Sequence, residues 1–401
     1  MTEQLALNEL INRDFIGLVE LMRLAHHGAD LSSLGQALIQ KTIDNPFDAY
    51  ALLDLSTVLQ LRGNRELALQ IQAQAIALQR EYMVPNQSPT NLRVLVLLSA
   101  GDLMANTPIE FLLENSSIDL TQFFVTEDLF TVAGAFNEDL PEHDVLFVAI
   151  AESEVNLSLL KQLTPLLSAW SKPVLNKPER IARMSRDGAC ALLENASGIA
   201  MPKTIRYALN TIEPQTFTYP IIIRPVDSHA GHDLDKIENA EALQHYLNEQ
   251  HDDAFFIAPF VDYKNSDGLY RKYRVILCAG EAFLCHLAMS VHWMIHYLNA
   301  GMAEDAKKRA EEAEAMNDFK QTFAKKHAAA FHAIYERTGL DYVGIDCSET
   351  PDGKLLIFEI DSCMIVHAID PVELFPYKPA HMQTLFDAFE LMLKKSSGEF
   401  H

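Results

Sequence analysis

Three carboxylates near the end of the chain are the residues whose types and spacing best suit chemistry. The segment Leu340–Val366 holds two apolar runs joined by a Pro-Asp-Gly turn signal, which predicts a β-hairpin. Because side chains alternate between the faces of a strand, Glu359 and Asp361 should point the same way, and Asp346 on the partner strand can join them. Such acids repel one another unless a hard cation such as Mg²⁺ or Mn²⁺ neutralises them. An ordinary solvated strand face is the alternative, but the apolar context favours the metal.

Basic residues upstream could supply the complementary positive charge. Arg224 lies in the apolar run PIIIRPV, and the small and polar residues 227–231 that follow it suit phosphate oxygens. A structural salt bridge is the competing interpretation for Arg224. Lys272 and Arg274 should share one face of a strand, where they need either the acids or a bound phosphate as counter-charge. A solvated edge strand is the alternative for that pair.

Two histidines form a weaker signal. His292 and His296 are four residues apart, which in a helix places them one turn apart. The pattern resembles half of a zinc motif, but Trp293 occupies the position of the catalytic glutamate. Substrate contacts or ordinary packing are therefore favoured, and a zinc hydrolase that holds stoichiometric zinc stays as a third hypothesis.

Composition limits the class of protein. The chain has 401 residues, and its 32 Lys+Arg against 55 Asp+Glu give a net charge of −23, which argues against nucleic-acid and anionic-membrane surfaces. A hydrophobic content of 49% excludes a disordered chain. The five cysteines include no C-x-x-C pair, so a disulfide framework or a structural zinc site is not expected. With no signal peptide and no apolar run of ~18 residues, we expect a cytoplasmic protein.

The elements that must position these residues begin with helices. Residues up to about Tyr82 show helical spacing, and a break at Gly63 separates two amphipathic segments. The segment Ala49–Arg80 is similar to a tetratricopeptide repeat, and so few repeats should dock on the rest of the chain or on a second protomer. A groove for a partner peptide is the sharper alternative. The stretch Met83–Thr90 has the composition of a linker.

An α/β unit is expected next. The apolar runs Val94–Leu98 and Val145–Ile150 are typical of buried parallel strands, and Thr107–Leu113 should begin a helix. The turn at 99–102 lacks the G-x-G-x-x-G fingerprint, so dinucleotide binding is weakly supported. This unit is interpreted as a scaffold.

From Lys177 onward the pattern is mixed. A long charged helix is predicted over 303–338, and a closing helix over 380–395. The predicted strands are Pro220–Val226, Phe255–Val261, Arg274–Cys278 and Phe283–Ala288.

Four segments together resemble the ATP-grasp superfamily, in its ribosomal-protein-glutamate-ligase-like branch. They are Pro173–Leu193, Tyr219–Gly231, Tyr270–Leu277 and Gly344–Asp361, and the resemblance extends from about residue 92 to 371. It implies an α/β (α+β) fold: an all-helical tetratricopeptide-like region over 1–88, an α/β pre-ATP-grasp domain over 89–176, and an ATP-grasp domain over 177–401. The small subdomain of the last should span about 200–262.

The resemblance also implies roles for single residues. Arg186 and Arg224 match the cations that contact nucleotide phosphates, which are usually lysines in the family, and Arg274 matches the arginine that steadies the transferring phosphoryl group. Asp346 and Glu359 match metal-binding acids, and Asp361 stands where asparagine is usual. The remaining expectations are phosphate contacts from the covering loop (Ser228, His229, Gly231), adenine contacts (Ile257, Ala258, Phe260, Val261), a ribose contact (Asp262 or Asp267) and acceptor-side contacts (Lys272, His292, His296).

The implied activity is that of an ATP- and Mg²⁺-dependent carboxylate–amine ligase. It would act through an acyl phosphate on small-molecule or peptide substrates and release ADP and phosphate, with a covering loop that excludes water. The alternative is a non-catalytic ATP-binding adaptor whose helical repeats recruit a partner protein. No nucleic acid or membrane partner is expected, and a homodimer is compatible with the helical region.

Overall fold

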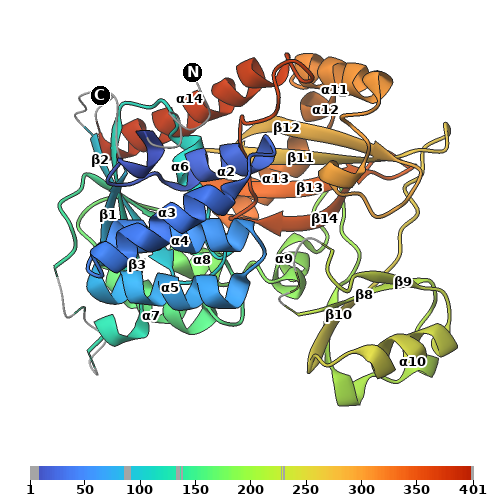
Figure 1. Ribbon diagram of the computed structural model, residues 1–401. Helices are drawn as coiled ribbons and strands as arrows, with labels where there is room; N and C mark the ends of the chain where they lie inside the picture. Colours follow the sequence, from blue (N-terminus) through green and yellow to red (C-terminus); the bar gives the residue numbers. More distant parts are fainter. Residues whose placement is uncertain are drawn as a thin grey trace. The chain divides into compact units, whose positions relative to one another are not determined.

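The structure is a computed structural model that describes residues 9–84, 92–131, 136, 139–226, 228 and 231–398. The fold is mixed α/β, and the described residues include three sheets. The chain divides into two compact units (Figure 1): unit 1 comprises Met1–Ala151, Val155–Ile181 and Cys363–His401, and unit 2 comprises Glu152–Glu154 and Ala182–Ser362. None of the described helices is both long enough and apolar enough to cross a membrane.

The domain boundaries expected from the sequence stay predictions, and they fall at the following places in the two units. The expected boundary at 88/89 lies inside unit 1, and the one at 176/177 lies close to Ile181, where the chain passes from unit 1 to unit 2. The segment from Cys363 onward belongs to unit 1 and not to the unit that holds the hairpin with the three acids.

Helices form the first part of unit 1. Asp30 and Asp48 accept backbone hydrogen bonds at the starts of two of them, which satisfies donors that a helix leaves unpaired. Gly63, with a φ of +80°, ends the third and confirms the predicted break. The helices are α2 (Leu18–His26), α3 (Leu31–Asp44), α4 (Ala49–Leu61) and α5 (Arg65–Leu78).

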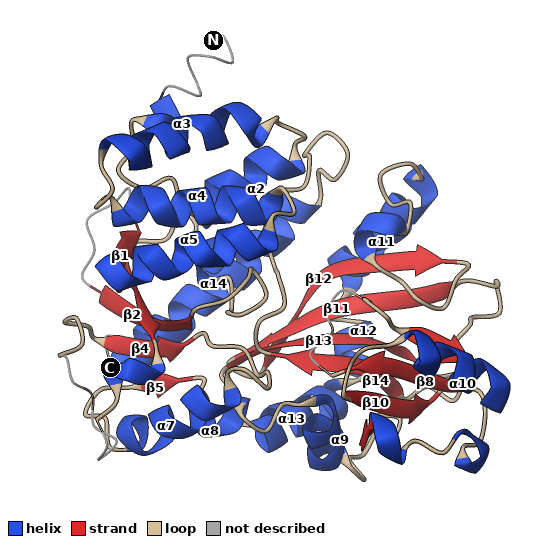
Figure 2. Ribbon diagram, turned by 60° about the horizontal axis from the view of Figure 1, so that its bottom comes forward, coloured by secondary structure: helices blue, strands red, loops and turns tan. Residues whose placement is uncertain are grey.

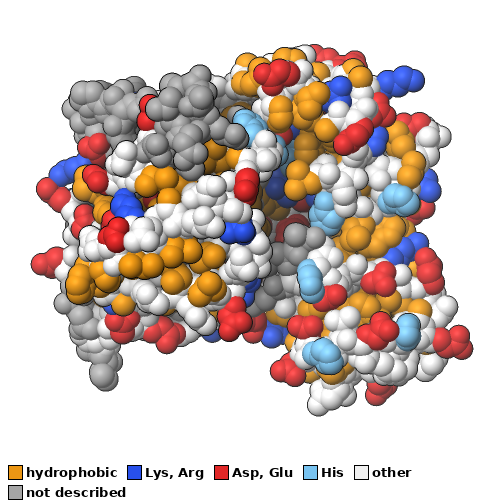
Figure 3. Space-filling view, viewed as in Figure 1, with side chains coloured by type: hydrophobic (Ala, Val, Ile, Leu, Met, Phe, Trp, Pro, Cys, Tyr) orange, Lys and Arg blue, Asp and Glu red, His pale blue; other side chains and the backbone are white. Residues whose placement is uncertain are grey.

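Large apolar side chains remain exposed on these helices. They are Ile39, Ile43 and Phe47 on and just after α3, and Leu67 and Leu78 on α5. Figure 3 shows hydrophobic side chains gathered over this part of the chain. The tetratricopeptide-like character of the region and its partner stay predictions.

The sheet of unit 1 has the order β1-β3-β2-β4-β5. As predicted, β2 lies parallel to β4, and its residues are almost all buried. The strands are β1 (Glu81–Val84), β2 (Leu92–Ser99), β3 (Ile118–Val125), β4 (Val145–Val148) and β5 (Val174–Leu175). The associated helices are α6 (Ile109–Leu112), α7 (Leu157–Ser168), α8 (Pro178–Ile181) and α14 (Lys378–Ser397), with the short η1 (Glu127–Leu129).

Two predictions for this region need correction. The composition of 83–90 predicts a linker that begins at Met83, but Met83 lies in β1, which pairs antiparallel with β3 because buried Tyr82 packs against aromatic rings, including that of Phe124. Val84 also lies in β1, and the rest of that linker, 85–90, lies outside the described residues. The helix predicted over 107–113 is a single turn, with Pro108 just before it. The closing helix is confirmed as α14.

Unit 2 contains a small antiparallel sheet in the order β7-β10-β8-β9. An apolar core that includes Ile223, Leu243 and Ile257 joins this sheet to α10. Figure 2 shows α10 against the sheet. The elements are β7 (Ile205–Ala208), β8 (Ile221–Pro225), β9 (Asp235–Ile237), β10 (Ala254–Pro259) and α10 (Ala240–Glu249), with the short η2 (Leu209–Thr211) and η3 (Pro214–Thr216).

The second sheet of unit 2 has the order β12-β11-β13-β14-β6. The predicted hairpin is confirmed: β13 and β14 pair antiparallel across a turn in which Gly353 has a φ of +82°. The strands are β6 (Ile199–Ala200), β11 (Tyr270–Cys278), β12 (Glu281–Ser290), β13 (Tyr342–Glu349) and β14 (Leu355–Asp361). The helices are α9 (Arg186–Leu193), α11 (Ala306–Asp318), α12 (Phe323–Lys326) and α13 (Ala328–Thr338), with η4 (Tyr297–Asn299).

The single long helix predicted over 303–338 is wrong, because the segment forms three helices, α11 to α13. The break lets Phe323 stack on Tyr273 of β11, with ring centroids 4.2 Å apart. A continuous charged helix would forgo this aromatic packing on the sheet. Periodicity cannot detect such a break, since it depends on a partner 50 residues away in the sequence.

Candidate functional site

Charged residues of three neighbouring strands form one row across the larger sheet of unit 2. Arg274 on β11 lies opposite Asp346 on β13, and Asp346 lies opposite Glu359 on β14. The ladder shifts register beside Asp346 in the β13–β14 pair and beside Arg274 in the β11–β12 pair. Bulges of this kind redirect side chains and are common beside functional sites. The row therefore combines opposite charges with irregular backbone at the same place.

Asp346 is the buried centre of this row, with 4% of the residue exposed. Its Oδ2 accepts a hydrogen bond from Lys272 Nζ at 2.9 Å, and its Oδ1 accepts one from Arg274 Nε at 2.8 Å. Burial by itself would raise the pKa of Asp346, but the charges of Arg274 and Lys272 hold it well below the ordinary value. Asp346 is thus ionised and fixes the direction of two cationic side chains.

Glu359 is paired with the start of a helix. Arg186, the first residue of α9, donates from Nη2 to Glu359 Oε1. The oxygen of Ser185 caps this helix by accepting from the Gly188 N–H at 3.2 Å. Burial opposes the charge of Glu359, but Arg186 and then Arg224 lower its pKa below the ordinary value. Both arginines expected to contact phosphates therefore act on the same carboxylate.

Arg224 lies on β8 of the smaller sheet and is buried, with 8% exposed. Its Nε donates to Ser228 Oγ at 2.9 Å, and its Nη2 donates to the Ser228 carbonyl oxygen. Burial, followed by the charge of Arg186, lowers the pKa of Arg224 to about 10. The two guanidinium groups repel each other, and the negative charge of Glu359, which acts on both, offsets part of this repulsion. Among the described residues, the guanidinium group of Arg224 donates hydrogen bonds to Ser228 and has no carboxylate at salt-bridge distance, so a structural salt bridge does not account for its position.

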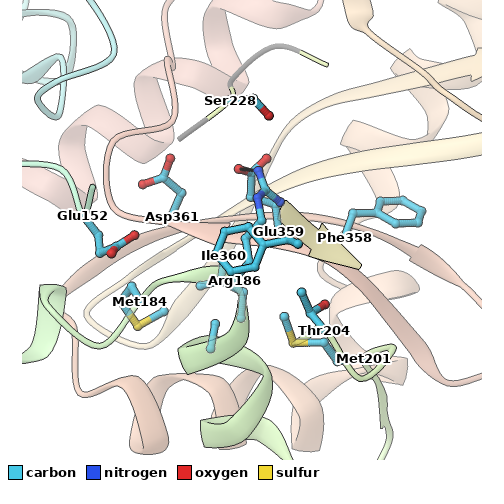
Figure 4. A pocket seen from close by; sticks show the side chains of 12 residues that line it. Glu152, Met184, Arg186, Met201, Thr204, Ser228, Phe358, Glu359, Ile360 and Asp361 are labelled. Carbon is cyan, nitrogen blue, oxygen red and sulfur yellow. Dashed lines mark hydrogen bonds and ion pairs between the residues drawn. The ribbon is translucent and has the colours of Figure 1, made fainter. Parts of the chain in front are cut away.

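A pocket in unit 2 opens beside these charges. One part of its lining is charged or polar, with Arg186, Glu359 and Asp361, and another part is apolar, with Met184 and Phe256. Figure 4 shows Arg186 and Glu359 side by side at its centre. The full lining is Glu152, Met184, Arg186, Ala189, Met201, Thr204, Ser228, Phe256, Phe358, Glu359, Ile360 and Asp361. A pocket with both kinds of lining suits a ligand that has an apolar ring and an anionic tail.

The three acids do not play equal parts. Glu359 and Asp361 line the pocket, whereas Asp346 is engaged by Lys272 and Arg274. Within the described part of the chain, no three Asp, Glu, His or Cys side chains are grouped closely enough to hold a metal ion by themselves. Two carboxylates on one strand face still match what Mg²⁺ takes from a protein when phosphate and water supply its other oxygens. Glu359 and Asp361 therefore fit a magnesium ion. Asp346 instead orients the cationic side chains of Lys272 and Arg274.

The expected adenine and ribose contacts lie on β10 and after it. Ile257 points into the core of the small subdomain, so only its backbone could face a ligand, whereas Phe256 lines the pocket. Phe260 lies under Lys236, whose Nζ is 4.1 Å from the ring centroid. Asp267 accepts from Arg271 Nη2 at 2.6 Å. The other expected contacts are Ala258 near the end of β10, Val261 after that strand, and Asp262, whose side chain accepts a hydrogen bond from the Lys264 N–H at 3.1 Å.

The histidine prediction needs correction. His292 and His296 are not on a helix: the chain bends through 291–294, and His296 precedes η4 as its N-cap. The spacing of four residues therefore does not bring them one turn apart. His296 does lie against the predicted phosphate loop, since a Cβ on Gly231 would come within 2.4 Å of His296 Nε2. His229 of that loop lies outside the described residues.

Sequence reasoning missed several pocket residues. Phe256 could have been found, because it lies opposite Arg224 in the β8–β10 pair and alternation places it on the face away from the core. Four lining residues carry no local signal, since they come from irregular segments without helix or strand: Glu152, Met184, Met201 and Thr204.

Comparisons with known proteins give distant structural similarities. No family model matches the chain, and no curated protein matches it. The VanG D-Ala:D-Ser ligase from Enterococcus faecalis is similar with a TM-score of 0.46 and 15% identity, covering 76% of this chain and 100% of that one. The RimK domain protein ATP-grasp from Sphaerobacter thermophilus gives 0.43 and 15%, covering 75% and 98%.

A third similar structure is the D-alanine–D-alanine ligase from Bacillus anthracis complexed with ATP. It gives a TM-score of 0.45 and 14% identity, covering 78% of this chain and 100% of that one. With TM-scores of 0.43–0.46 and identities of 14–15%, these three similarities establish neither a family nor an activity for this chain.

Proposed function

We propose that unit 2 carries an ATP-dependent carboxylate–amine ligase site that acts through an acyl phosphate. The observation that carries the proposal is the charged row Arg274–Asp346–Glu359, with Arg186 and Arg224 converging on Glu359. Phosphoryl transfer needs positioning and charge neutralisation more than covalent chemistry by the protein. Fixed guanidinium groups beside a pocket supply both.

In the proposed binding mode the nucleotide base occupies the apolar part of the pocket and the phosphates the charged part. Met184, Met201 and Phe256 offer apolar surface, and planar rings gain stability by packing on such side chains. Arg186 and Arg224 donate to phosphate oxygens, which replaces their repulsion by attraction. Ser228, bonded to Arg224, lies in the loop beside the phosphates.

The first chemical step joins the donor carboxylate to phosphorus. A carboxylate oxygen attacks the γ-phosphorus, the bond from that phosphorus to the ADP oxygen breaks, and an acyl phosphate forms. Arg274, oriented by Asp346, stabilises negative charge on the transferring group. Lys272, on the same strand face, faces the donor or acceptor group. Glu359 and Asp361 would hold Mg²⁺, which would supply neutralisation of phosphate charge.

The second step forms the carbon–nitrogen bond. A neutral amine attacks the acyl carbon, the carbon–oxygen bond to phosphate breaks, and the amine loses a proton to give the amide and inorganic phosphate. An acyl phosphate is readily hydrolysed, so the site must exclude water while it exists. No side-chain nucleophile is needed in either step.

The test is ATP-dependent turnover with unbiased substrates. Purified protein is incubated with Mg²⁺·ATP and pools of amino acids, peptides and small carboxylates, and ADP release is followed together with mass spectrometry of products. A product whose mass equals two pool members minus water supports the ligase. Nucleotide binding without stimulated ADP release from any pool would instead favour the adaptor, and absence of nucleotide binding would refute both.

A further inference from the structure

The charged row continues onto a fourth strand. In the β11–β12 pair, His286 lies opposite Arg274, and the next pair, Val275 with Leu284, skips Cys285. The extra residue on β12 therefore falls beside the arginine that the proposed mechanism uses. An arginine with Asp346 on one side and His286 on the other has its position set by two strands.

His286 is in turn packed against an anchored aromatic ring. The Tyr297 ring lies 4.5 Å from the His286 ring, centroid to centroid, with an interplanar angle of 36°. The Tyr297 hydroxyl donates to Glu312 Oε2 at 2.8 Å, and the Leu287 N–H donates to Glu312 Oε1 at 3.0 Å. Both carboxylate oxygens of Glu312 thus hold elements that flank His286.

Glu312 is unusual for its helix. α11 has the sequence AKKRAEEAEAMND, and Glu312 is fully buried while most residues of the helix are accessible. A buried carboxylate is costly unless it receives hydrogen bonds. The hydrogen bonds from the Tyr297 hydroxyl and the Leu287 N–H help to explain why it is tolerated there, and they make it an anchor for Tyr297.

The same tyrosine also begins η4, whose N-cap is His296. The His296 N–H donates to Asn299 Oδ1 at 3.1 Å, which fixes this short turn. His296 lies against Gly231 and interacts electrostatically with Lys272 and Arg274. The position of Tyr297 therefore bears on two imidazoles, one beside Arg274 and one beside the phosphate loop.

We propose that Tyr297, anchored by Glu312, is a positioning residue of this site that sets His286 beside Arg274 and His296 beside Gly231. Its effect on turnover rests on the proposed function, whereas its effect on the two imidazoles does not. Tyr297 acts through other residues and touches neither substrate in this scheme.

The test uses a graded pair of substitutions with a matched control. Tyr297→Phe keeps the ring on His286 and removes the hydroxyl from Glu312, and Tyr297→Leu removes both. Tyr219→Phe is the control, because it deletes one partly buried hydroxyl hydrogen bond, to the Pro214 carbonyl at 2.6 Å, in the same unit. Should Tyr297→Phe fail to fold, Glu312→Gln is the substitute, because it replaces the charged acceptor of the Tyr297 hydroxyl by a neutral amide.

The first readout is NMR of labelled histidines, with the two signals assigned through His286→Gln and His296→Gln. We expect Tyr297→Phe to displace both signals and Tyr219→Phe to leave both in place. The second readout is steady-state kinetics: kcat should fall roughly tenfold in Tyr297→Phe and ~100-fold in Tyr297→Leu with KM for ATP little changed, because misplaced catalytic groups cost about that much.

The outcomes separate the two proposals. Unchanged histidine signals in Tyr297→Phe would overturn the positioning role whether or not the protein is a ligase. Displaced signals in a protein without turnover would support the positioning role and count against the ligase. Displaced signals with an unchanged kcat would show that the two imidazoles do not matter to turnover and would overturn the role in catalysis.

Discussion

Replacing Asp346 by asparagine removes the counter-charge of two cations and should strongly destabilise unit 2. The Asp346 side chain is 5% exposed, and those of Lys272 and Arg274 are 12% and 21% exposed. Asparagine keeps the size and one carbonyl oxygen, so the change isolates the charge. Lys272 and Arg274 would then face each other's charge in a site that water reaches poorly.

The expected loss follows from burial. Removing one partner of a buried ion pair costs about 3–5 kcal/mol in unfolding free energy, and the partial exposure of the two cations favours the lower end. Domains are stabilised by only about 5–15 kcal/mol, so a loss near 3 kcal/mol is a large part of the whole. With an ordinary denaturant slope, it lowers the midpoint of urea unfolding by roughly 1–2 M.

The assay must report on unit 2 alone. Among the two tryptophans, Trp293 lies in unit 2 and Trp170 in unit 1, so fluorescence in a Trp170→Phe background follows the right unit. Glu281→Gln is the matched control, since it breaks an ion pair with Lys320 in which both side chains are 57% exposed. Such a pair is worth about 0–1 kcal/mol, so its midpoint should hardly move.

One result would refute the electrostatic reasoning. If Asp346→Asn lowers the urea midpoint no more than Glu281→Gln does, Lys272 and Arg274 do not depend on Asp346 for their counter-charge. A changed denaturant slope in either variant would instead mean that the surface exposed on unfolding has changed.

Three further predictions concern turnover and pH. Glu359→Gln should abolish ADP release but leave a cooperatively folded protein, because the change keeps volume and removes a charge that would hold Mg²⁺ beside Arg186; undiminished ADP release would contradict the site assignment. The pKa values of Asp346 and Glu359 lie below their ordinary values of 3.8 and 4.5, so the unfolded chain binds more protons in acid and stability is lost as pH falls through the folded-state pKa values. Urea midpoints between about pH 3 and 6 should show this acid loss, and Asp346→Asn should flatten it. In unit 1, burial raises the pKa of Asp54 to about 7, although the Ile16 and Gly17 N–H groups partly oppose the shift. Because the folded state then binds more protons than the unfolded one, stability should fall by up to ~4 kcal/mol as pH rises from about 4 through 7. Trp170 fluorescence in a Trp293→Phe background measures this slope, which Asp54→Asn should reduce.

Several parts of this protein follow from the sequence by local rules. The turn between β13 and β14 needs Gly353 at positive φ, and period-two alternation then places Glu359 and Asp361 on one strand face. The parallel strands β2 and β4 are long apolar runs that can only be buried. These features depend on residues that are neighbours in the chain, so they can be predicted from the sequence alone.

Other parts depend on partners that are distant in the chain. The pairing of Arg274 with Asp346 joins residues 72 apart in sequence, and that of Arg186 with Glu359 joins residues 173 apart. Sequence spacing cannot set such register, because it depends on how whole strands align. The spacing of His292 and His296 is uninformative for a related reason: η4 is held by the contact of Tyr297 with Glu312, which no local periodicity contains.

The sequence by itself therefore determined which residues could carry charge chemistry and the strand on which each acid lies. Only the tertiary structure decided that Asp346 pairs with the side chains of Lys272 and Arg274. It also decided that Glu359 and Asp361 line the pocket. The physical reason is that composition and alternation fix the type and face of a side chain, whereas its partner is fixed by strand register and by the packing of helices such as α9.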